Sequence, residues 1–447
     1  MTTPEASTDP LTQLATRAWI YGYPLLYNLE EIDGFVRESG SFPVSAPWNA
    51  FGAARDLLGP ETRFVTPNND TLYLMAACDL SGGPLLLEVP DTHDRYYVLQ
   101  LVDAWTNNVA YIGRRATGTA AGRYLLIGPG QSPRVPEGVT SVHLPTDAFM
   151  IVGRVAVDGP DDLPSARATQ DGFSLRPLDG ATPGRGIPIP STDVPDDLAW
   201  WERMRVSLAA FPPPAADAQL VAALEPLGLT ATESPYRDAS AELRGALVAG
   251  AAAGKATIEQ LMHKVNVSPN GWQFSTHVFD YSLDTFEVGT VDSPEWRIAD
   301  RTQAYALRAV AVRAGLWGNH GYEANYGAIW KDADGQPLDG ANRYELRLPA
   351  DMPVVAFWSL TMYDVPEFYL VANAIDRYSI GDRTPGLVTD PEGFVTIRIQ
   401  ADDPGGELSA NWLPAPRAPF RPVMRLYQPR PEALAAGFDL PPIRRIG

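Results

Sequence analysis

The sequence has one cysteine and very few lysines, and both shortages narrow the chemistry that the protein can use. Cys78 is the only cysteine among 447 residues, so an intrachain disulfide and a metal site built from several cysteines are excluded. Of the 35 basic residues, only Lys255, Lys264 and Lys331 are lysines. Schiff-base catalysis is therefore restricted to three candidates, and all of them stand in polar or helix-surface contexts.

The motifs of several large enzyme classes are also missing. The chain has no Gly-x-Ser-x-Gly elbow, no Walker loop and no Gly-x-Gly-x-x-Gly fingerprint. Nucleophile-elbow hydrolases, P-loop NTPases and Rossmann dehydrogenases therefore lack sequence support. The five histidines are His93, His143, His263, His277 and His320. No two of them share the i, i+4 spacing of a helical zinc site.

Long apolar runs and an excess of positive charge are absent as well. No run approaches the roughly 20 apolar residues of a membrane-spanning helix, and residues 1–10 lack the pattern of a signal peptide. The net charge of −19 repels nucleic-acid phosphates and anionic membrane surfaces. We therefore expect a cytoplasmic protein with a small-molecule substrate and with neither a nucleic-acid nor a membrane partner. A homo-oligomer is left open.

Hydrophobic patterning predicts strands in two separate parts of the chain. Asp9 and Pro10 predict a helix start, and Pro24 predicts that this helix ends or kinks. Short apolar runs bounded by Gly, Pro and Asp turns predict the strands. These strands are residues 72–77, 85–89, 96–102, 124–127, 149–155, 343–348, 354–362, 394–399 and 422–427. Helical periodicity dominates between the two groups of strands.

These patterns predict a mainly β protein with α, in which two β-sandwich or barrel-like domains are joined by a helical segment. A chain of this length favours two domains. The predicted parts are an N-terminal helix (1–33), a first β-rich domain (34–157), a connection with helices (158–315) and a second β-rich domain (316–447). No short repeat is visible, although two β domains of similar size permit a distant duplication.

The segment from Thr66 to Tyr73 contains the densest polar cluster beside a predicted strand. Asn68, Asn69 and Asp70 either form a hydrogen-bonded corner or belong to a site, because their side chains bond readily to nearby backbone. As site residues, Asp70 and Tyr73 would be catalytic, and Asn68 and Asn69 would bind substrate.

Two further polar groups are candidate substrate-binding residues. Asp103, Trp105 and Asn107 follow a predicted strand, at an end where binding groups often collect. Arg377 and Tyr378 stand in a segment with two guanidinium groups, which either clamps an anionic substrate or forms an internal ion-pair network.

A Gly-flanked segment at residues 317–323 combines a titratable base with a carboxylate. His320 and Glu323 are therefore candidate catalytic residues. The alternative is an ordinary solvent-exposed loop histidine.

The acidic residues give little sign of a metal site. Asp332 to Gly335 looks like the start of a calcium loop, but Arg343 stands where the closing glutamate is needed, so a hairpin turn is favoured. We predict no metal ligand and no organic cofactor, while an oxygen-ligated divalent metal stays possible in principle.

Several motifs in fixed order resemble a known pair of domains. Residues 66–73 (Thr-Pro-Asn-Asn-Asp-Thr-Leu-Tyr), 89–91, 95–97 and 125–130 resemble the domain of unknown function 1254. Residues 357–364, 377–384, 411–416 and 425–427 resemble the domain of unknown function 1214. The resemblance implies two β-rich domains with a helical connection. It implies no established reaction and transfers no catalytic residue, and residues 317–326 depart from the Gly-Asn-x-Pro-Glu-Glu-Ala form associated with this loop.

The first functional hypothesis is a cofactor-independent enzyme that acts on a small, largely apolar metabolite in a cleft between the β domains. Acid–base chemistry would suit hydrolysis first, and a lyase, isomerase or cyclase as alternatives. Trp105, Trp358 and Tyr363 would line the pocket. Two other hypotheses are a non-catalytic ligand-binding or assembly protein and an enzyme that uses an oxygen-ligated metal.

Overall fold

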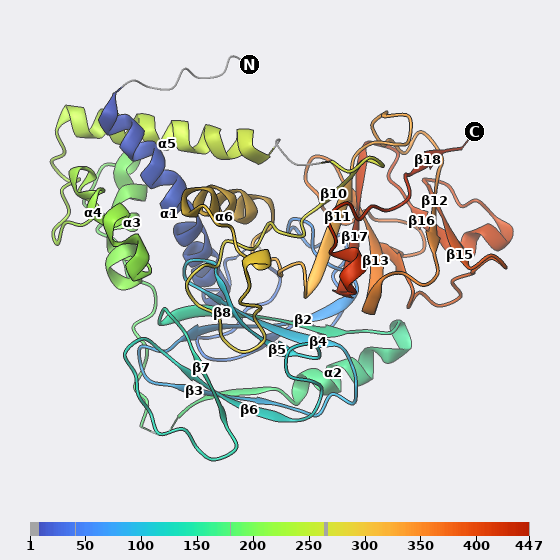
Figure 1. The fold of residues 1–447 in the computed structure, drawn as a ribbon, viewed down its shortest axis with the longest axis horizontal. Helices are drawn as coiled ribbons and strands as arrows, with labels where there is room; N and C mark the ends of the chain where they lie inside the picture. The colour runs from blue at the N-terminus through green and yellow to red at the C-terminus, as the bar shows by residue number, and fades with distance from the viewer. Residues whose placement is uncertain (1–8, 41, 179, 263–266, 447) are drawn as a thin grey trace.

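Two β-sandwiches and a group of helices make up the chain, as the computed structural model shows (Figure 1). The structure describes residues 9–40, 42–178, 180–262 and 267–446. All helices except α2 (Leu163–Asp171) gather around the N-terminal helix α1 (Pro10–Val36), the first sandwich lies below them in Figure 1, and the second sandwich lies to their right. Four mostly antiparallel sheets form the sandwiches, and none of them closes into a barrel within the described residues. The fold is therefore mainly β with α, as the sequence predicts.

The first sandwich pairs a five-stranded sheet with a four-stranded one. The larger sheet has the order β1 (Gly52–Ala53), β2 (Thr71–Asp79), β8 (Ala148–Ala156), β4 (Tyr97–Asp103), β5 (Asn108–Gly113). The smaller sheet has the order β7 (Thr140–His143), β6 (Gly122–Ile127), β3 (Leu85–Val89), β9 (Ser174–Pro177). Side chains such as Leu87, Leu99 and Leu126 alternate inward from the two sheets and fill one core.

The second sandwich is built in the same way. Its larger sheet has the order β10 (Trp272–Phe274), β11 (Ala324–Ile329), β17 (Phe420–Pro429), β13 (Val354–Asp364), β14 (Ser379–Gly381). Its smaller sheet has the order β16 (Trp412–Pro414), β15 (Phe394–Gln400), β12 (Tyr344–Pro349), β18 (Arg444–Arg445). Leu346, Leu360 and Ile397 are fully buried between these sheets.

The two sandwiches share one topology, strand for strand. Adding nine to each strand number of the first sandwich gives the strand order of the second. The only parallel neighbours in the described sheets are β6 with β7 and β15 with β16, which correspond. In register, Tyr73 opposes Arg154 in the first sandwich and Tyr326 opposes Arg425 in the second. The distant duplication that the sequence permits is therefore visible in the sheets.

All helices except α2 form a third layer against the sandwiches, and α2 packs on β2 and β8 of the first sandwich. The bounds of the helices are α1 (Pro10–Val36), α2 (Leu163–Asp171), α3 (Ala199–Ala210), α4 (Ala218–Ala222), α5 (Ala241–Met262) and α6 (Arg301–Gly315). Single 3₁₀ turns or short 3₁₀ segments lie at Pro160–Asp162, Asp196–Leu198, Ala215–Asp217, Glu225–Leu227, Pro294–Trp296, Gly406–Asn411 and Pro431–Ala433. Asp9 caps α1 by accepting from the Thr12 backbone N–H at 2.9 Å. None of the helices in the described part combines the length and apolar character that crossing a membrane requires.

Three details of the predicted organisation differ from the structure. The helix α1 continues through Pro24 to Val36, because its buried face packs against its neighbours along its whole length. The predicted boundary at residue 157 leaves β9 out of the first sandwich, and the boundary at residue 316 leaves β10 out of the second. Both are short edge strands, whose few residues give a weak periodic signal. His263 and Lys264 lie outside the described residues.

Candidate functional site

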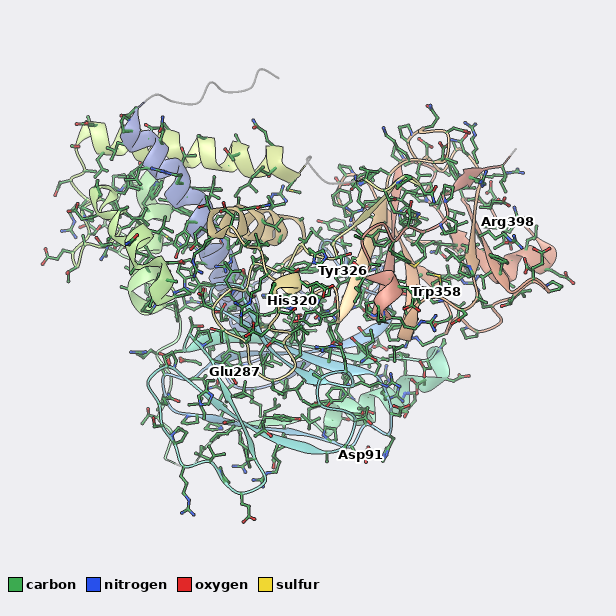
Figure 2. The ribbon with its side chains drawn as sticks, in the orientation of Figure 1. Asp91, Glu287, His320, Tyr326, Trp358 and Arg398 are labelled. Carbon is green, nitrogen blue, oxygen red and sulfur yellow. The ribbon has the colours of Figure 1, made fainter. Side chains whose placement is uncertain are left out.

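A large cavity lies where the two sandwiches and helix α6 meet. Its volume is about 1030 Å³, and its walls come from β2 and β8 of the first sandwich, β11 and β17 of the second, and α6. Most of the lining side chains are apolar. Figure 2 shows Tyr326 and His320 at this central junction and Trp358 within the second sandwich. The cavity is thus the place where both halves of the duplicated fold face one ligand-sized space.

The first sandwich places a tyrosine and an arginine side by side on the cavity wall. Arg154 lies over the ring of Tyr73, with 5.7 Å between the guanidinium carbon and the ring centroid. Arg154 is buried and donates to the Gln100 side chain at 3.1 Å and to the Trp317 carbonyl at 3.2 Å. Both acceptors are neutral, so these bonds hold the guanidinium group in place without neutralising it.

The second sandwich provides the corresponding pair, Tyr326 and Arg425. Arg425 is buried and donates to the Thr361 hydroxyl at 2.9 Å and to the Thr66 carbonyl at 3.0 Å. The hydroxyl oxygen of Tyr326 accepts from the Asn319 side chain at 3.0 Å. Arg154 and Arg425 therefore make the same two kinds of bond. Each donates to a side chain of its own sandwich and to a backbone carbonyl of the other sandwich, in the loop before β11 for Arg154 and in the loop before β2 for Arg425.

A third arginine, Arg421, reaches the cavity from the start of β17. It donates to the Thr66 hydroxyl at 2.8 Å, and its guanidinium carbon lies 4.0 Å from the ring centroid of Phe368. Its Nε is buried and has no partner among the described residues. Burial lowers the pKa of Arg421 to about 10, so the group stays charged near neutral pH.

Thr66 is held in an unusual backbone conformation between these arginines. Its φ is 53°, which is a strained value for a β-branched residue. Arg421 bonds its hydroxyl and Arg425 bonds its carbonyl. The two guanidinium groups therefore fix the loop that carries the predicted polar cluster.

Of the residues predicted from sequence, Asn68 and Tyr73 line this cavity. The Asn68 side-chain oxygen accepts from the Thr71 backbone at 3.1 Å and from the Thr71 hydroxyl at 2.9 Å, as a structural corner would. Its Nδ2 is buried without a partner among the described residues. Asn68 thus combines the two predicted roles, because one end forms the corner and the other end is left as a free donor on the cavity wall.

Asp70 lies at the junction but does not line the cavity. It is 6% exposed, and its two carboxylate oxygens accept from the Ser359 hydroxyl at 2.5 Å and from the Tyr427 hydroxyl at 2.8 Å. Both donors belong to the second sandwich. Asp70 therefore joins the two sandwiches, and its partner Tyr427 lines the cavity.

Glu323 occupies the corresponding place in front of β11. Its carboxylate accepts from Arg115 at 2.5 Å and from the Tyr96 hydroxyl at 3.2 Å, both from the first sandwich. Burial raises the pKa of Glu323. Asp70 and Glu323 are thus paired interdomain carboxylates, each bonded by a tyrosine of the opposite sandwich.

His320 is buried, which corrects the expectation of a solvent-exposed loop histidine. The residue is 2% exposed, and its Nδ1 lies 3.1 Å from the Tyr111 hydroxyl and 3.0 Å from the Tyr322 hydroxyl. Burial lowers the pKa of His320 to about 3, with a smaller contribution from Arg115. The imidazole is neutral above that pH, and His320 is not among the residues that line the cavity.

The polar residues after β4 hold the helices to the first sandwich. Asp103 accepts from the Asn107 backbone and side chain, each at 2.8 Å, and burial raises the pKa of Asp103 to about 6. Arg308 of α6 donates to Asn107 at 2.6 Å. Trp105 donates to the Phe211 carbonyl at 3.0 Å inside the helical core.

The remaining predicted residues also make structural contacts away from the cavity surface. Tyr363 donates to the Pro67 carbonyl at 2.5 Å, and Trp358 is enclosed in the core of the second sandwich. Arg377 donates to three backbone carbonyls, those of Ser409, Ala410 and Trp412. Asn69 donates to the Leu58 carbonyl at 2.6 Å, and Tyr378 donates to Asp376 at 2.8 Å. Trp105, Trp358 and Tyr363 therefore do not line the cavity, which corrects the prediction.

The sequence-based search missed the three arginines and Tyr326. Arg154 and Arg425 each stand inside an apolar run that was predicted as a strand. A lone charged residue in such a run is a detectable signal, because an ionised side chain is costly to bury without a partner. Within the described residues, no group of three or more His, Cys, Asp or Glu side chains is placed to hold a metal ion.

Comparison with known proteins identifies both halves of the chain. Residues 48–177 match the family described as protein of unknown function (DUF1254), and residues 323–431 match protein of unknown function (DUF1214). The crystal structure of the VPA0106 protein from Vibrio parahaemolyticus has 24% identity and a TM-score of 0.74, with 98% of this chain and 100% of that chain covered. A crystal structure of an uncharacterized protein from Burkholderia cenocepacia has 14% identity and a TM-score of 0.43, with 99% and 91% covered. The first likeness shows the fold, and no curated protein matches the chain.

Proposed function

Because the chain belongs to the family that joins a DUF1254 domain to a DUF1214 domain, and because both domains line one cavity, we propose that it is a small-molecule enzyme. It binds a small, largely apolar metabolite between the two sandwiches and acts on it by acid–base chemistry without an organic cofactor. Hydrolysis is the first choice of reaction, and elimination, isomerisation or cyclisation are the alternatives.

The size and lining of the cavity carry this proposal. Ligand pockets commonly have volumes of about 300–1,000 Å³, mostly apolar walls and a few polar groups. The interdomain cavity, at about 1030 Å³, reaches the upper end of that range. Its three arginines and the Thr66 loop lie on the walls made by the two sandwiches, and α6 presents mainly apolar side chains such as Leu307 and Val310. Further polar residues also line the cavity, namely Ser268, Gln273, Ser275, Thr276, His277 and Gln303. The apolar walls and the arginines suit a largely apolar molecule that has a polar end.

Of the acid–base residues predicted from the sequence, Tyr73 is the one that lines the cavity. Its hydroxyl oxygen accepts from the Asn68 backbone N–H at 3.4 Å, and no described residue accepts the hydrogen of its own hydroxyl. The neighbouring guanidinium group of Arg154 would stabilise negative charge that develops on a substrate or on the phenol. We assign Tyr73 the role of general acid and base, with Arg154 as the electrostatic stabiliser.

A second candidate function is binding without catalysis. It is favoured by the positions of Asp70 and His320, the other acid–base candidates, because their side chains are occupied by contacts within the protein and do not line the cavity. The cavity would then store or carry the same class of molecule.

The neutral fluorescent probe N-phenyl-1-naphthylamine tests whether the cavity accepts apolar molecules. We expect it to bind the wild-type protein and to bind Ala306→Trp at least about tenfold more weakly, since Ala306 lines the cavity from α6 and a large side chain fills the space. The matched control is Ala252→Trp, at an exposed position of α5. Equal probe binding by wild type and Ala306→Trp would overturn the proposed location.

A metabolite extract separates the two candidate functions. The purified protein is incubated with a cell extract, and bound and consumed compounds are identified by mass spectrometry. A compound that wild type consumes and Tyr73→Phe only retains supports the enzyme. A compound that wild type retains unchanged supports the binding protein.

A further inference from the structure

The geometry points to an apolar carboxylic acid as the ligand, with its carboxylate bound by the guanidinium groups of Arg154, Arg421 and Arg425. This inference rests on the proposed function, because it names the chemical class of the molecule in that cavity. It goes further in assigning an anion-binding role to three residues and a chemical identity to one end of the ligand.

Among the described residues, the three arginines have no carboxylate as an ion-pair partner. None of them forms an ion pair within 4.0 Å with a described residue, and their hydrogen bonds go to neutral oxygens. The chain carries 54 acidic and 35 basic residues, yet the described residues that line the cavity include three arginines and no Asp or Glu. The cavity wall is therefore positively charged although the protein as a whole is negatively charged. This local excess of positive charge indicates a binding site for an external anion.

Two buried carboxylates lie near these arginines, and neither balances them fully. Glu323 is bonded to Arg115 at 2.5 Å, which supplies its own counter-charge. Asp70 acts electrostatically on Arg425, although its oxygens are held by Ser359 and Tyr427. One available carboxylate charge therefore faces three guanidinium charges.

Unused donors point to the same part of the cavity. The Nδ2 of Asn68 and the Nε of Arg421 are buried without partners in the described structure, and both residues line the cavity. A buried donor without a partner destabilises the folded protein, and an unpaired buried charge destabilises it more. A ligand carboxylate would satisfy these donors and supply the missing charge at once.

The duplicated fold explains why the charges converge. Arg154 and Arg425 occupy corresponding strands of the two sandwiches, opposite Tyr73 and Tyr326. Arg154 lies over the ring of Tyr73, and Arg425 bonds the carbonyl of Thr66, two residues before Asn68, whose backbone N–H donates to the Tyr73 hydroxyl. The two guanidinium groups therefore face the same segment of the cavity wall. A planar carboxylate between them can accept from both, whereas the apolar walls along α6 take the remainder of the molecule.

Comparison of an acid with its ester tests the charge without any mutation. The probes are 11-(dansylamino)undecanoic acid and its methyl ester, which differ in the carboxylate alone. We expect wild type to bind the acid at least about tenfold more tightly than the ester, because a charge-assisted hydrogen bond contributes about 1.5–3 kcal/mol. Equal affinity for the two probes would overturn the inference and leave the proposed cavity intact.

Arginine variants then locate the anion site. Arg421→Met is expected to weaken binding of the acid about tenfold or more and to change binding of the ester by less than about twofold. The matched control is Arg134→Met, which makes the same change of charge at an exposed position and should leave both affinities unchanged. Equal loss of acid binding in both variants would indicate a general charge effect and overturn the assignment.

Two further outcomes have separate meanings. If dodecyl phosphate displaces the acid probe more effectively than dodecanoate does, the anion is a phosphate and the carboxylate assignment is wrong. If neither dansyl probe nor N-phenyl-1-naphthylamine binds, the proposed function fails together with the inference.

Discussion

The carboxylate of Asp70 accepts a hydrogen bond from the hydroxyl of Tyr427, with 2.8 Å between the two oxygens, although the residues are 357 positions apart. A second bond joins the sandwiches with the roles exchanged: the carboxylate of Glu323 belongs to the second sandwich, and it accepts from the Tyr96 hydroxyl of the first sandwich at 3.2 Å. These two bonds hold the walls of the cavity together.

Replacing Asp70 should destabilise the protein. In Asp70→Asn, an oxygen still accepts from one hydroxyl, but the amide N–H₂ group faces the other, so we expect a loss of about 1–2 kcal/mol in the free energy of unfolding. Asp70→Ala leaves both Ser359 and Tyr427 without an acceptor and should lose about 2–4 kcal/mol. Urea denaturation measures both losses, with exposed Glu137→Gln as the control. Unchanged stability of Asp70→Ala would contradict a joining role.

His320 should make the protein sensitive to mild acid. Its pKa is lowered from 6.5 to about 3 in the folded chain, so below about pH 6.5 the unfolded chain takes up a proton that the folded chain does not. Between pH 6.5 and pH 5 this difference removes about 1.6 kcal/mol of stability. His320→Gln should therefore lose less stability over this interval than wild type does. Unfolding by urea at the two pH values measures this, and exposed His93→Gln should behave as wild type.

Arg421→Met should bind acids less well without losing stability. The pKa shift from 12.5 to about 10 corresponds to a burial cost of roughly 3 kcal/mol for the charged group. The bond to Thr66 and the contact with Phe368 together offset about 2 kcal/mol of that cost. Thermal unfolding of the unliganded variant should therefore show a stability equal to wild type or about 1 kcal/mol higher. A large loss of stability would mean that Arg421 is mainly a structural residue.

For Trp105 we expect the opposite result to that for Arg421, namely a loss of stability without a loss of binding. Trp105 was expected in the pocket but lies in the helical core. Trp105→Phe removes the bond to the Phe211 carbonyl and leaves a small void, so we expect a loss of about 2–3 kcal/mol in unfolding free energy. Binding of N-phenyl-1-naphthylamine to the folded variant should match wild type. A loss of probe binding without a loss of stability would show that Trp105 lines the pocket and would contradict this prediction.

The sequence predicts the strands well wherever a buried run is long and bounded by turns. Residues 85–89 coincide with β3, and residues 149–155 fall within β8. The strands β5 and β11 were missed, since Asn108 and Asn325 give them polar starts. Those amides are buried and bonded within the fold, which hydrophobic patterning cannot reveal.

The candidate site was predicted less completely, for a physical reason. Asp70, His320 and Glu323 were chosen for their chemistry, and that chemistry is used in contacts between the sandwiches that span more than 200 positions. Such partners become visible only when the two sheets are placed together. The resemblance to the paired domains was confirmed because it depends on local motifs in fixed order.

Chemical labelling of Cys78 can measure how often the two sheets of the first sandwich separate. Its side chain is 0% exposed between the two sheets, and burial raises the pKa of the thiol well above its ordinary value. A thiol reagent attacks the thiolate, so labelling has to wait until the sheets separate. Since the chain has no second sulfhydryl group, the labelling rate of the unaltered protein measures that separation alone. A ligand that binds between the two sandwiches and stabilises the folded protein will therefore slow the labelling of Cys78.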